Sequence, residues 1–352
     1  MAVIVSLFNH KGGVSKTTTA FNLGWKLARL GRRVMMIDCD PQCNLTGMVL
    51  GLSNVDEDNT ILGETEGIPN NIREGLRPAF ESRPVPMKPV NCLSVPKNPN
   101  LFLMPGNIGL AEYETTLGIA QELSGSVVTL KNLPGSLRHL IDITCQKYAI
   151  DVAIVDLSPS LGAINQNLLS ISDLFLVPMA PDYFSTMAIN SISDVLPRWK
   201  KWLSDAQNSQ ALAGADYPFP KKNPKFLGYI VQRYRPRNGA PSRAFLKWIA
   251  ALESGVKDTL LPALKLAGML LDHTVYDQFD ADPHRPLLQM SDFNSLIALS
   301  QEHQTPIFEL TKEQINQQGS VLQITEKSRD DFDQLFQVAG AKILGLIDAS
   351  RV

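Results

Sequence analysis

Val3-Ile-Val-Ser-Leu-Phe-Asn-His-Lys-Gly-Gly-Val-Ser-Lys-Thr-Thr-Thr-Ala20 contains three local patterns in a row. Residues 3–8 are mostly apolar and β-branched, which predicts a buried strand. Residues 9–15 form a glycine-containing loop, and residues 16–30 have the pattern of a helix that Gly31 ends. A strand, a glycine loop and a helix in this order direct backbone N–H groups and the positive end of a helix dipole at one point. We therefore predict a phosphate-binding loop.

The loop departs from the general pattern G-x-x-x-x-G-K-[ST], because Ser15 stands where the second glycine belongs. Lys16 is placed to meet the β- and γ-phosphates of a nucleotide, and Thr17 is placed to offer its hydroxyl to Mg²⁺. Lys11 is a second lysine at the mouth of the loop. The predicted nucleotide contacts are Lys11, Gly12, Gly13, Val14, Ser15, Lys16, Thr17 and Thr18.

The run Lys11-Gly-Gly-Val-Ser-Lys-Thr-Thr18 closely resembles the deviant Walker A motif of the ParA/MinD class of P-loop ATPases, nearest to the Soj-like partition group. The resemblance implies an α/β fold with a doubly wound, mostly parallel sheet of the P-loop NTPase type and flanking helices. It implies ATP and Mg²⁺ as cofactors. It also makes Lys11 the signature lysine, which reaches across a homodimer to the partner's nucleotide. Ser15 adds a β-carbon where the backbone turns tightly.

Two further predicted strands deliver carboxylates near this loop. Residues 32–40 end in Asp38 and Asp40, and residues 151–156 end in Asp156. The carboxyl ends of parallel strands are where an open sheet binds its ligand. By resemblance to the family's switch I, Asp40 orients the attacking water near Mg²⁺ and Asp38 orders the loop.

As the Walker B residue of that resemblance, Asp156 holds Mg²⁺ through water. The predicted catalytic residues are Lys11, Lys16 and Asp40, and the predicted metal site comprises Thr17, Asp40 and Asp156.

The rest of the chain reads as part of one domain over residues 1–352. A proline-rich, loop-rich excursion at about 51–100 is either a partner-binding or dimer-flanking insertion or a passive surface elaboration. Gln232 ends a predicted strand where the family places residues near the adenine base. Further strands are predicted at 101–106, 173–179 and 226–234, and helices at about 71–80, 110–123, 134–148 and 329–347.

Composition describes an ordinary globular protein: 352 residues, 44% hydrophobic, with a net charge of −2. The first predicted strand leaves no room for a signal peptide or for the helix-turn-helix domain of larger ParA relatives, and no apolar run is long enough to span a membrane. Four cysteines without a CxxC pair indicate reduced thiols and a cytoplasmic protein. Because the last predicted helix belongs to the core, we expect no membrane tether.

Positive charge gathers in residues 198–247, which hold eleven lysines and arginines against two acids. Such a basic segment is typical of a surface that binds duplex phosphates without sequence preference, although a solvated basic loop is an alternative. The candidate DNA-binding residues are Lys221, Lys222, Lys225, Arg233, Arg235, Arg237, Arg243 and Lys247.

These features predict a Mg-ATP-dependent, dimerising ATPase that binds non-specific double-stranded DNA in its ATP state and is then nucleoid-associated. It would partition or position a plasmid or chromosomal cargo, and hydrolysis would reset it. Turnover would be slow until dimerisation, or a centromere-binding or other protein partner, completes the site. The alternative is an ATP-dependent switch that acts on a protein partner or complex without binding DNA. A metabolic ATP-using enzyme is a third possibility, for which we find no substrate-specific constellation.

Overall fold

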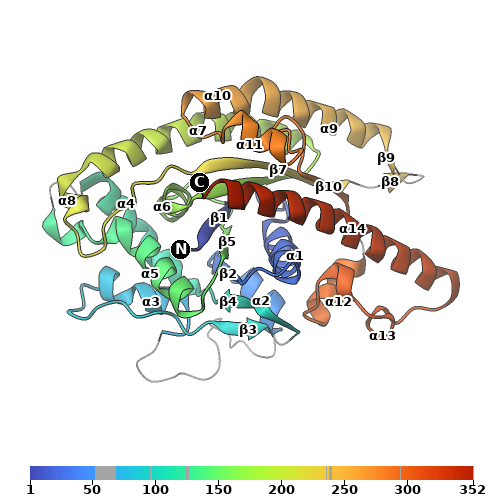
Figure 1. Ribbon diagram of the computed structural model, residues 1–352, viewed down its shortest axis with the longest axis horizontal. Helices are drawn as coiled ribbons and strands as arrows, with labels where there is room; N and C mark the ends of the chain where they lie inside the picture. The colour runs from blue at the N-terminus through green and yellow to red at the C-terminus, as the bar shows by residue number, and fades with distance from the viewer. Residues whose placement is uncertain are drawn as a thin grey trace.

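The computed structural model describes residues 1–51, 69–95, 97–123, 127–234, 236–237, 240–293 and 295–351. Within them, eight strands form one sheet in the order β10-β7-β6-β1-β5-β2-β4-β3 (Figure 1). Neighbouring strands are parallel except β3 and β4, and β8 and β9 form a separate antiparallel pair. The strands are β1 (Val3–Leu7), β2 (Val34–Cys39), β3 (Leu93–Val95), β4 (Asn98–Met104), β5 (Val152–Leu157), β6 (Leu174–Met179), β7 (Lys225–Tyr234), β8 (Pro236–Arg237), β9 (Ala240–Pro241) and β10 (Leu288–Ser291).

Helices cover both faces of the sheet (Figure 1). The α-helices are α1 (Lys16–Arg29), α2 (Asn44–Leu50), α3 (Ile72–Phe80), α4 (Tyr113–Leu123), α5 (Leu133–Lys147), α6 (Ala163–Ile171), α7 (Tyr183–Asn208), α8 (Gln210–Ala213), α9 (Arg243–Gly255), α10 (Leu261–Leu266), α11 (His273–Gln278), α12 (Ser295–Glu302), α13 (Lys312–Ile315) and α14 (Gly319–Ala349). Short turns of other helix types are η2 (Ile108–Glu112), η3 (Val128–Leu130), η4 (Val256–Leu260) and η5 (Ile307–Glu309).

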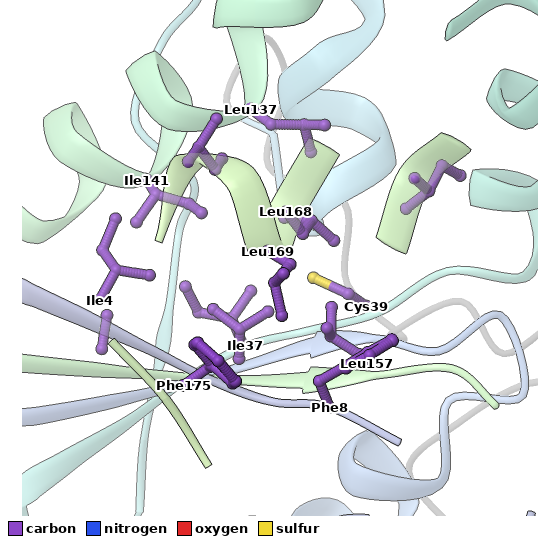
Figure 2. Packing of buried hydrophobic residues seen from close by; sticks show 14 of the residues in the cluster. Ile4, Phe8, Ile37, Cys39, Leu137, Ile141, Leu157, Leu168, Leu169 and Phe175 are labelled. Carbon is purple, nitrogen blue, oxygen red and sulfur yellow. The ribbon is translucent and has the colours of Figure 1, made fainter. Parts of the chain in front are cut away.

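The two cores follow from the alternation of side chains along each strand. In β1, Ile4 packs with Leu137, Ile141 and Phe175 on one face (Figure 2), whereas Val3, Val5 and Leu7 pack on the other. The first core is closed by α3 to α7 and α9, and the second by α1, α2, α12 and α14. A parallel sheet buried on both faces has this near-continuous apolar character in its strands. This is the doubly wound, mostly parallel sheet that the sequence predicts.

The parallel strands bring their carboxyl ends to one edge of the sheet, which is where the predicted site lies. β1 lies between β5 and β6, and β2 pairs with β5 so that Asp38 is the register neighbour of Asp156. Leu7, the last residue of β1, is the neighbour of Asp156 on its other side. The loop after β1 and the two predicted carboxylates therefore meet because of strand order alone.

Two segments differ from the sequence-based expectations. The predicted last helix at 329–347 begins ten residues earlier, at Gly319, a start that the sequence pattern missed because the first turns carry no buried residue and therefore lack the apolar pattern of a core-facing helix. The excursion at 51–100 contains α3, β3 and the start of β4, and its residues 52–68 lie outside the described part. No helix in the described ranges combines the length and the apolar character needed to cross a bilayer.

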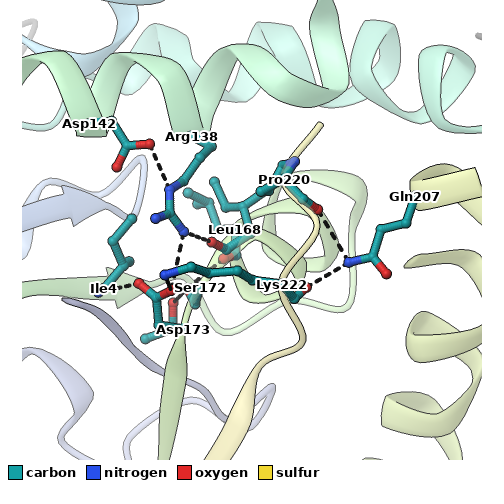
Figure 3. Close-up of polar contacts among 11 residues, drawn as sticks. Ile4, Arg138, Asp142, Leu168, Ser172, Asp173, Gln207, Pro220 and Lys222 are labelled. Carbon is teal, nitrogen blue, oxygen red and sulfur yellow. Dashed lines mark hydrogen bonds and ion pairs between the residues drawn. The ribbon is translucent and has the colours of Figure 1, made fainter. Parts of the chain in front are cut away.

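A buried ionic cluster ties together the amino-terminal ends of the central strands (Figure 3). The buried Arg138 guanidinium donates to Asp142 at 2.9 Å and to the Ile171 carbonyl at 2.7 Å, and it lies 3.6 Å from Asp173. Asp173 accepts the Ile4 backbone N–H at 2.9 Å and an ammonium N–H of the half-exposed Lys222 at 2.7 Å. Asp173 thus compensates a buried cation and a buried backbone donor together.

Replacing Asp173 by alanine should lower the free energy of unfolding by about 3 kcal/mol, because it leaves a buried guanidinium and a backbone N–H with one partner fewer. Lys222→Ala is the matched control and should cost less than about 1 kcal/mol, because its ammonium is solvent-accessible. Urea unfolding of both variants measures the difference. Equal losses for the two variants would show that Asp173 acts only through its surface ion pair.

Candidate nucleotide site

The loop after β1 has the curled backbone of an anion-binding nest. Gly13 has φ +72° and Ser15 has φ +55°, so both lie in the left-handed region. Ser15 is also the N-cap of α1, and its side chain makes no capping hydrogen bond there. The serine therefore occupies, under strain, a conformation that glycine adopts freely. This explains in physical terms why the general pattern has glycine at this position.

Lys16 is buried at the base of the loop. Its Nζ donates to the Asn9 carbonyl at 2.8 Å and to the Lys11 carbonyl at 3.3 Å. Burial lowers the pKa of Lys16, and the charges of Asp156 and Asp40 oppose that shift. The Lys16 ammonium is thus held inside the loop, close enough to Asp156 and Asp40 to interact with their charges.

The Asp38 carboxylate orders the segment after β2, as the resemblance implies. Its Oδ2 accepts the Thr46 backbone N–H at 2.8 Å and the Thr46 hydroxyl at 2.7 Å. Burial raises the pKa of Asp38 to about 6 against these bonds. These two hydrogen bonds attach the start of α2 to the end of β2. Asp40 instead lines the cleft beside the loop, and its Oδ1 accepts the Gln42 backbone N–H at 3.0 Å.

Asp156 is fully buried, and neither of its carboxylate oxygens accepts a hydrogen bond within 3.5 Å from the described residues. Burial raises the pKa of Asp156 to about 8 and the charge of Asp38 adds to this, whereas Thr17 and Lys16 act in the opposite direction. A buried carboxylate with unused lone pairs next to a threonine hydroxyl fits a hydrated Mg²⁺, which takes few protein ligands. The described residues contain no cluster of three or more His, Cys, Asp or Glu side chains that could hold a metal ion.

Lys11 extends away from the loop toward α7. Its Nζ donates to both oxygens of Asp182 at 2.6 Å and to the Ser185 hydroxyl at 3.1 Å, and it lies 5.7 Å from the centroid of the Phe184 ring. Asp182 is the N-cap of α7 and accepts the Ser185 backbone N–H at 2.8 Å. Burial works against ionisation, yet these bonds lower the pKa of Asp182. Sequence reasoning missed this pair, although the N-cap pattern of Asp182 and Ser185 was visible.

Gln232 lies beneath the loop rather than at its mouth. Its Nε2 donates to the Val14 carbonyl at 2.7 Å and to the Thr19 hydroxyl at 2.9 Å, and the side chain is fully buried. Gln232 therefore supports the loop and the first turn of α1. A contact of Gln232 with adenine stays a prediction.

The loop opens into a cleft of about 940 Å³. One wall consists of residues 12–18 and the other of α2 with the segment 301–304 at the end of α12. Asp40 and Pro159 also line it. Sequence reasoning missed residues 301–304, because only tertiary packing brings this distant segment beside α2.

The predicted basic segment is divided by the structure into two groups. Lys221, Lys222 and Lys225 lie at the start of β7, where Lys222 pairs with Asp173 and Lys225 donates to the Gly268 carbonyl at 2.6 Å. β7 separates the two ends of the predicted basic segment by about 30 Å, and DNA binding by these residues stays a prediction.

The second basic group lies on the same sheet edge as the nucleotide loop. The backbone puts Arg233 near the end of β7 and Arg237 in β8, whereas Arg235 lies outside the described residues. Arg243 and Lys247 are exposed on the first turns of α9.

The fold and the loop together define a P-loop nucleotide-binding protein. The AAA domain family model AAA_31 matches residues 2–208, more than half of the chain, so the chain belongs to that family. Within it, the chain is a P-loop ATPase of the ParA/MinD class.

Similar proteins include the chromosome partitioning protein ParA of Myxococcus xanthus, which is 30% identical over 204 residues, 57% of this chain and 60% of the relative. The sporulation initiation inhibitor protein Soj of Bacillus subtilis is 27% identical over 206 residues, 58% of this chain and 68% of Soj. Among solved structures, protein DIP2308 from Corynebacterium diphtheriae has a TM-score of 0.55 at 22% identity, with 73% of this chain and 89% of that chain covered. That likeness supports the fold alone.

Ser15→Gly should raise the free energy of unfolding by up to about 1 kcal/mol, because it removes the left-handed strain of the folded loop. The greater entropy of the unfolded glycine chain offsets part of this gain. Ser15→Ala is the control and should give no increase, since it keeps the β-carbon. Thermal unfolding of the nucleotide-free protein measures both. An equal gain from alanine would assign the effect to the hydroxyl instead.

Proposed function

We propose that this protein is a Mg-ATP-dependent, dimerising ATPase that binds double-stranded DNA in its ATP state and partitions or positions a DNA cargo. The observation that carries the proposal is Lys11, whose side chain extends away from its own loop toward a surface that a second copy can cover. The cytoplasm, or the nucleoid when DNA is bound, is the corresponding location.

Each predicted residue has a distinct role in this proposal. Lys16 and the loop N–H groups bind the β- and γ-phosphates, and Asp40 orients the attacking water. Thr17 would hold Mg²⁺ directly and Asp156 would hold it through water. The ion would neutralise charge on the phosphate oxygens. Turnover stays slow in a single copy, because Lys11 points to Asp182 rather than into its own cleft.

An exposed aromatic surface next to Lys11 supports dimerisation. Phe184 is 68% exposed, and Tyr183, Met187 and Leu246 are exposed around it on the first turns of α7 and α9. Apolar side chains gathered in this way mark an interaction site. Because Lys11 lies against Phe184, a second copy seated on this surface would also lie close to Lys11.

The basic group near the loop supports ATP-dependent DNA binding better than the distal group does. Arg243 and Lys247 lie on the element that carries part of the aromatic surface, so dimerisation would bring two copies of this group together. In the distal group, Lys222 and Lys225 already have protein partners. Non-specific DNA affinity requires several cations aimed at phosphates.

Lys11→Ala should still bind ATP but should lose ATP-dependent dimerisation and hydrolysis, whereas Lys16→Ala should lose ATP binding itself. Asp182→Asn keeps the N-cap and removes the ion pair, so it should dimerise at up to about fivefold lower protein concentration, the equivalent of about 1 kcal/mol. Light scattering with ATP or ADP measures dimerisation. Normal dimerisation and hydrolysis by Lys11→Ala would refute the role of Lys11 in trans.

Fluorescence anisotropy of a random-sequence duplex should rise with protein plus Mg-ATP and not with Mg-ADP, and the affinity should fall steeply with salt. Arg243→Ala combined with Lys247→Ala should weaken this binding and reduce its salt dependence. Lys221→Ala combined with Lys222→Ala is the matched control and should leave it nearly unchanged. A larger loss in the control pair would move the DNA surface to the distal end.

Absence of DNA binding, with ATP-dependent dimerisation intact, would favour the second candidate, a switch that acts on a protein partner. The exposed side chains of Tyr183, Phe184 and Met187 are the observation behind it, because a partner protein can use an apolar helix face of this kind. A centromere-binding or other stimulating protein is a proposed partner under the first candidate as well.

A further inference from the structure

The second half of the nucleotide loop is held from below by a side chain of a distant strand. Gln232 lies near the end of β7 and is fully buried. Its Nε2 donates to the Val14 carbonyl at 2.7 Å, to the Thr19 hydroxyl at 2.9 Å and to the Ser15 carbonyl at 3.3 Å. An amide NH2 group has two hydrogens, so these three oxygens share its donors. One amide nitrogen therefore joins β7 to the loop and to the first turn of α1.

Thr19 extends this support to the Ser15 carbonyl. The Thr19 hydroxyl donates to that carbonyl at 2.8 Å, and the Thr19 backbone N–H donates to it at 2.9 Å. Because the single hydrogen of the hydroxyl is used in this way, the hydroxyl accepts from Gln232. All three oxygens beside the amide nitrogen are thus acceptors, and only the NH2 end of the glutamine can face them. The other end, Oε1, is buried and accepts no hydrogen bond from the described residues, so Gln232 contributes through its donors.

Holding these carbonyls also directs N–H groups of the loop. A trans peptide bond is planar, and its C=O and N–H point in opposite directions. The Val14 carbonyl faces Gln232 beneath the loop, so the N–H of Ser15 points to the other side. The Ser15 carbonyl and the N–H of Lys16 have the same relation. Residues 14–16 line the cleft, and their N–H groups are therefore donors that a bound phosphate would use.

Ser15 is the loop position at which such support is needed. Its φ of +55° and ψ of +39° are left-handed, a conformation that is unfavourable for a residue with a β-carbon but not for glycine. A serine without this support would relax and turn the two N–H groups away from the cleft. We propose that Gln232 is a positioning residue that compensates for Ser15, because its amide holds the serine in the left-handed conformation that directs the N–H groups of residues 15 and 16 at a phosphate.

The proposal rests on nucleotide binding at the loop, but on neither dimerisation nor DNA binding. It makes positions 15 and 232 a coupled pair. With glycine at position 15 the left-handed conformation persists without help, so nucleotide binding should no longer depend on Gln232.

A double-mutant cycle between the two positions tests this coupling. Gln232→Met keeps the length of the side chain and removes both donors. With serine at position 15, it should raise the dissociation constant of N-methylanthraniloyl-ADP with Mg²⁺ about tenfold, the equivalent of about 1.4 kcal/mol. In the Ser15→Gly protein, the same change should raise it less than about threefold. Fluorescence of the labelled nucleotide measures both, and a diphosphate keeps ATP-dependent dimerisation out of the experiment.

Asn167→Leu is the matched control. Asn167 of α6 is a second fully buried amide, whose Nδ2 donates to the Pro134 carbonyl at 3.1 Å and whose Oδ1 accepts no hydrogen bond from the described residues. Its loss should lower the free energy of unfolding and leave the dissociation constant unchanged with either residue at position 15. Gln232→Asn, which is one methylene shorter, withdraws the amide from the loop and provides a milder variant where Gln232→Met folds poorly.

Urea unfolding of the nucleotide-free variants runs the same cycle without a ligand. Here Gln232→Met should cost less with serine at position 15 than with glycine, because the released serine recovers its strain. Coupling of opposite sign in binding and in unfolding would support the proposal. Equal effects of Gln232→Met with serine and with glycine would overturn it. A wild-type protein that binds no nucleotide would refute the proposed function instead, and the unfolding cycle would still decide the pairing of Gln232 with Ser15.

Discussion

The nucleotide site depends on a buried carboxyl group, that of Asp156, which accepts no hydrogen bond from the described residues. Strand pairing fixes its position, because Asp38 and Asp156 are register neighbours on parallel strands and both are removed from water. Burial raises the pKa of both groups, the charge of Asp38 adds to the rise for Asp156, and the charge of Asp40 adds to the rise for Asp38. Thr46 donates two hydrogen bonds to Asp38, whereas the Thr17 hydroxyl and the Lys16 ammonium oppose the rise in the pKa of Asp156. A hydrated divalent cation fits this arrangement. Its binding would favour the folded state by mass action as well as neutralise phosphate charge.

The two halves of the sheet contribute differently to the site. The half containing β2 and β5 supplies the carboxylates, whereas the half containing β6, α7 and β7 fixes the loop. Asn9 donates from the loop to the Pro178 carbonyl at the end of β6, Lys11 is held by Asp182 before α7, and Gln232 supports Val14 from β7. The loop therefore lies between an acidic side and a side that fixes its backbone. Lys11 belongs to the second side, which is also the side that carries the exposed aromatic surface.

The sequence predicted what local patterns determine and missed what long-range packing determines. The loop, the strand-end acids and the doubly wound sheet follow from residue periodicity and motif spacing over short windows. Short windows do not predict three other features: the role of Gln232, the cleft wall formed by residues 301–304, and the division of the basic segment. Each of these depends on how β7, α12 and their neighbours pack in three dimensions. The start of α14 was placed ten residues late for the same reason. Its first turns carry no buried residue, so the apolar pattern that marks a core-facing helix begins only at Phe332.

The helix α1 connects the nucleotide loop physically to the far surface of the molecule. It begins at the loop, and Lys26 on its buried side forms an ion pair with Asp333 of α14, while Gly340 packs against Leu30. A close-packed interior transmits displacement rather than absorbing it. The nucleotide loop is thus attached through α1 to the long carboxy-terminal helix α14, so a displacement of the loop reaches a helix whose first turns lie far from the nucleotide cleft.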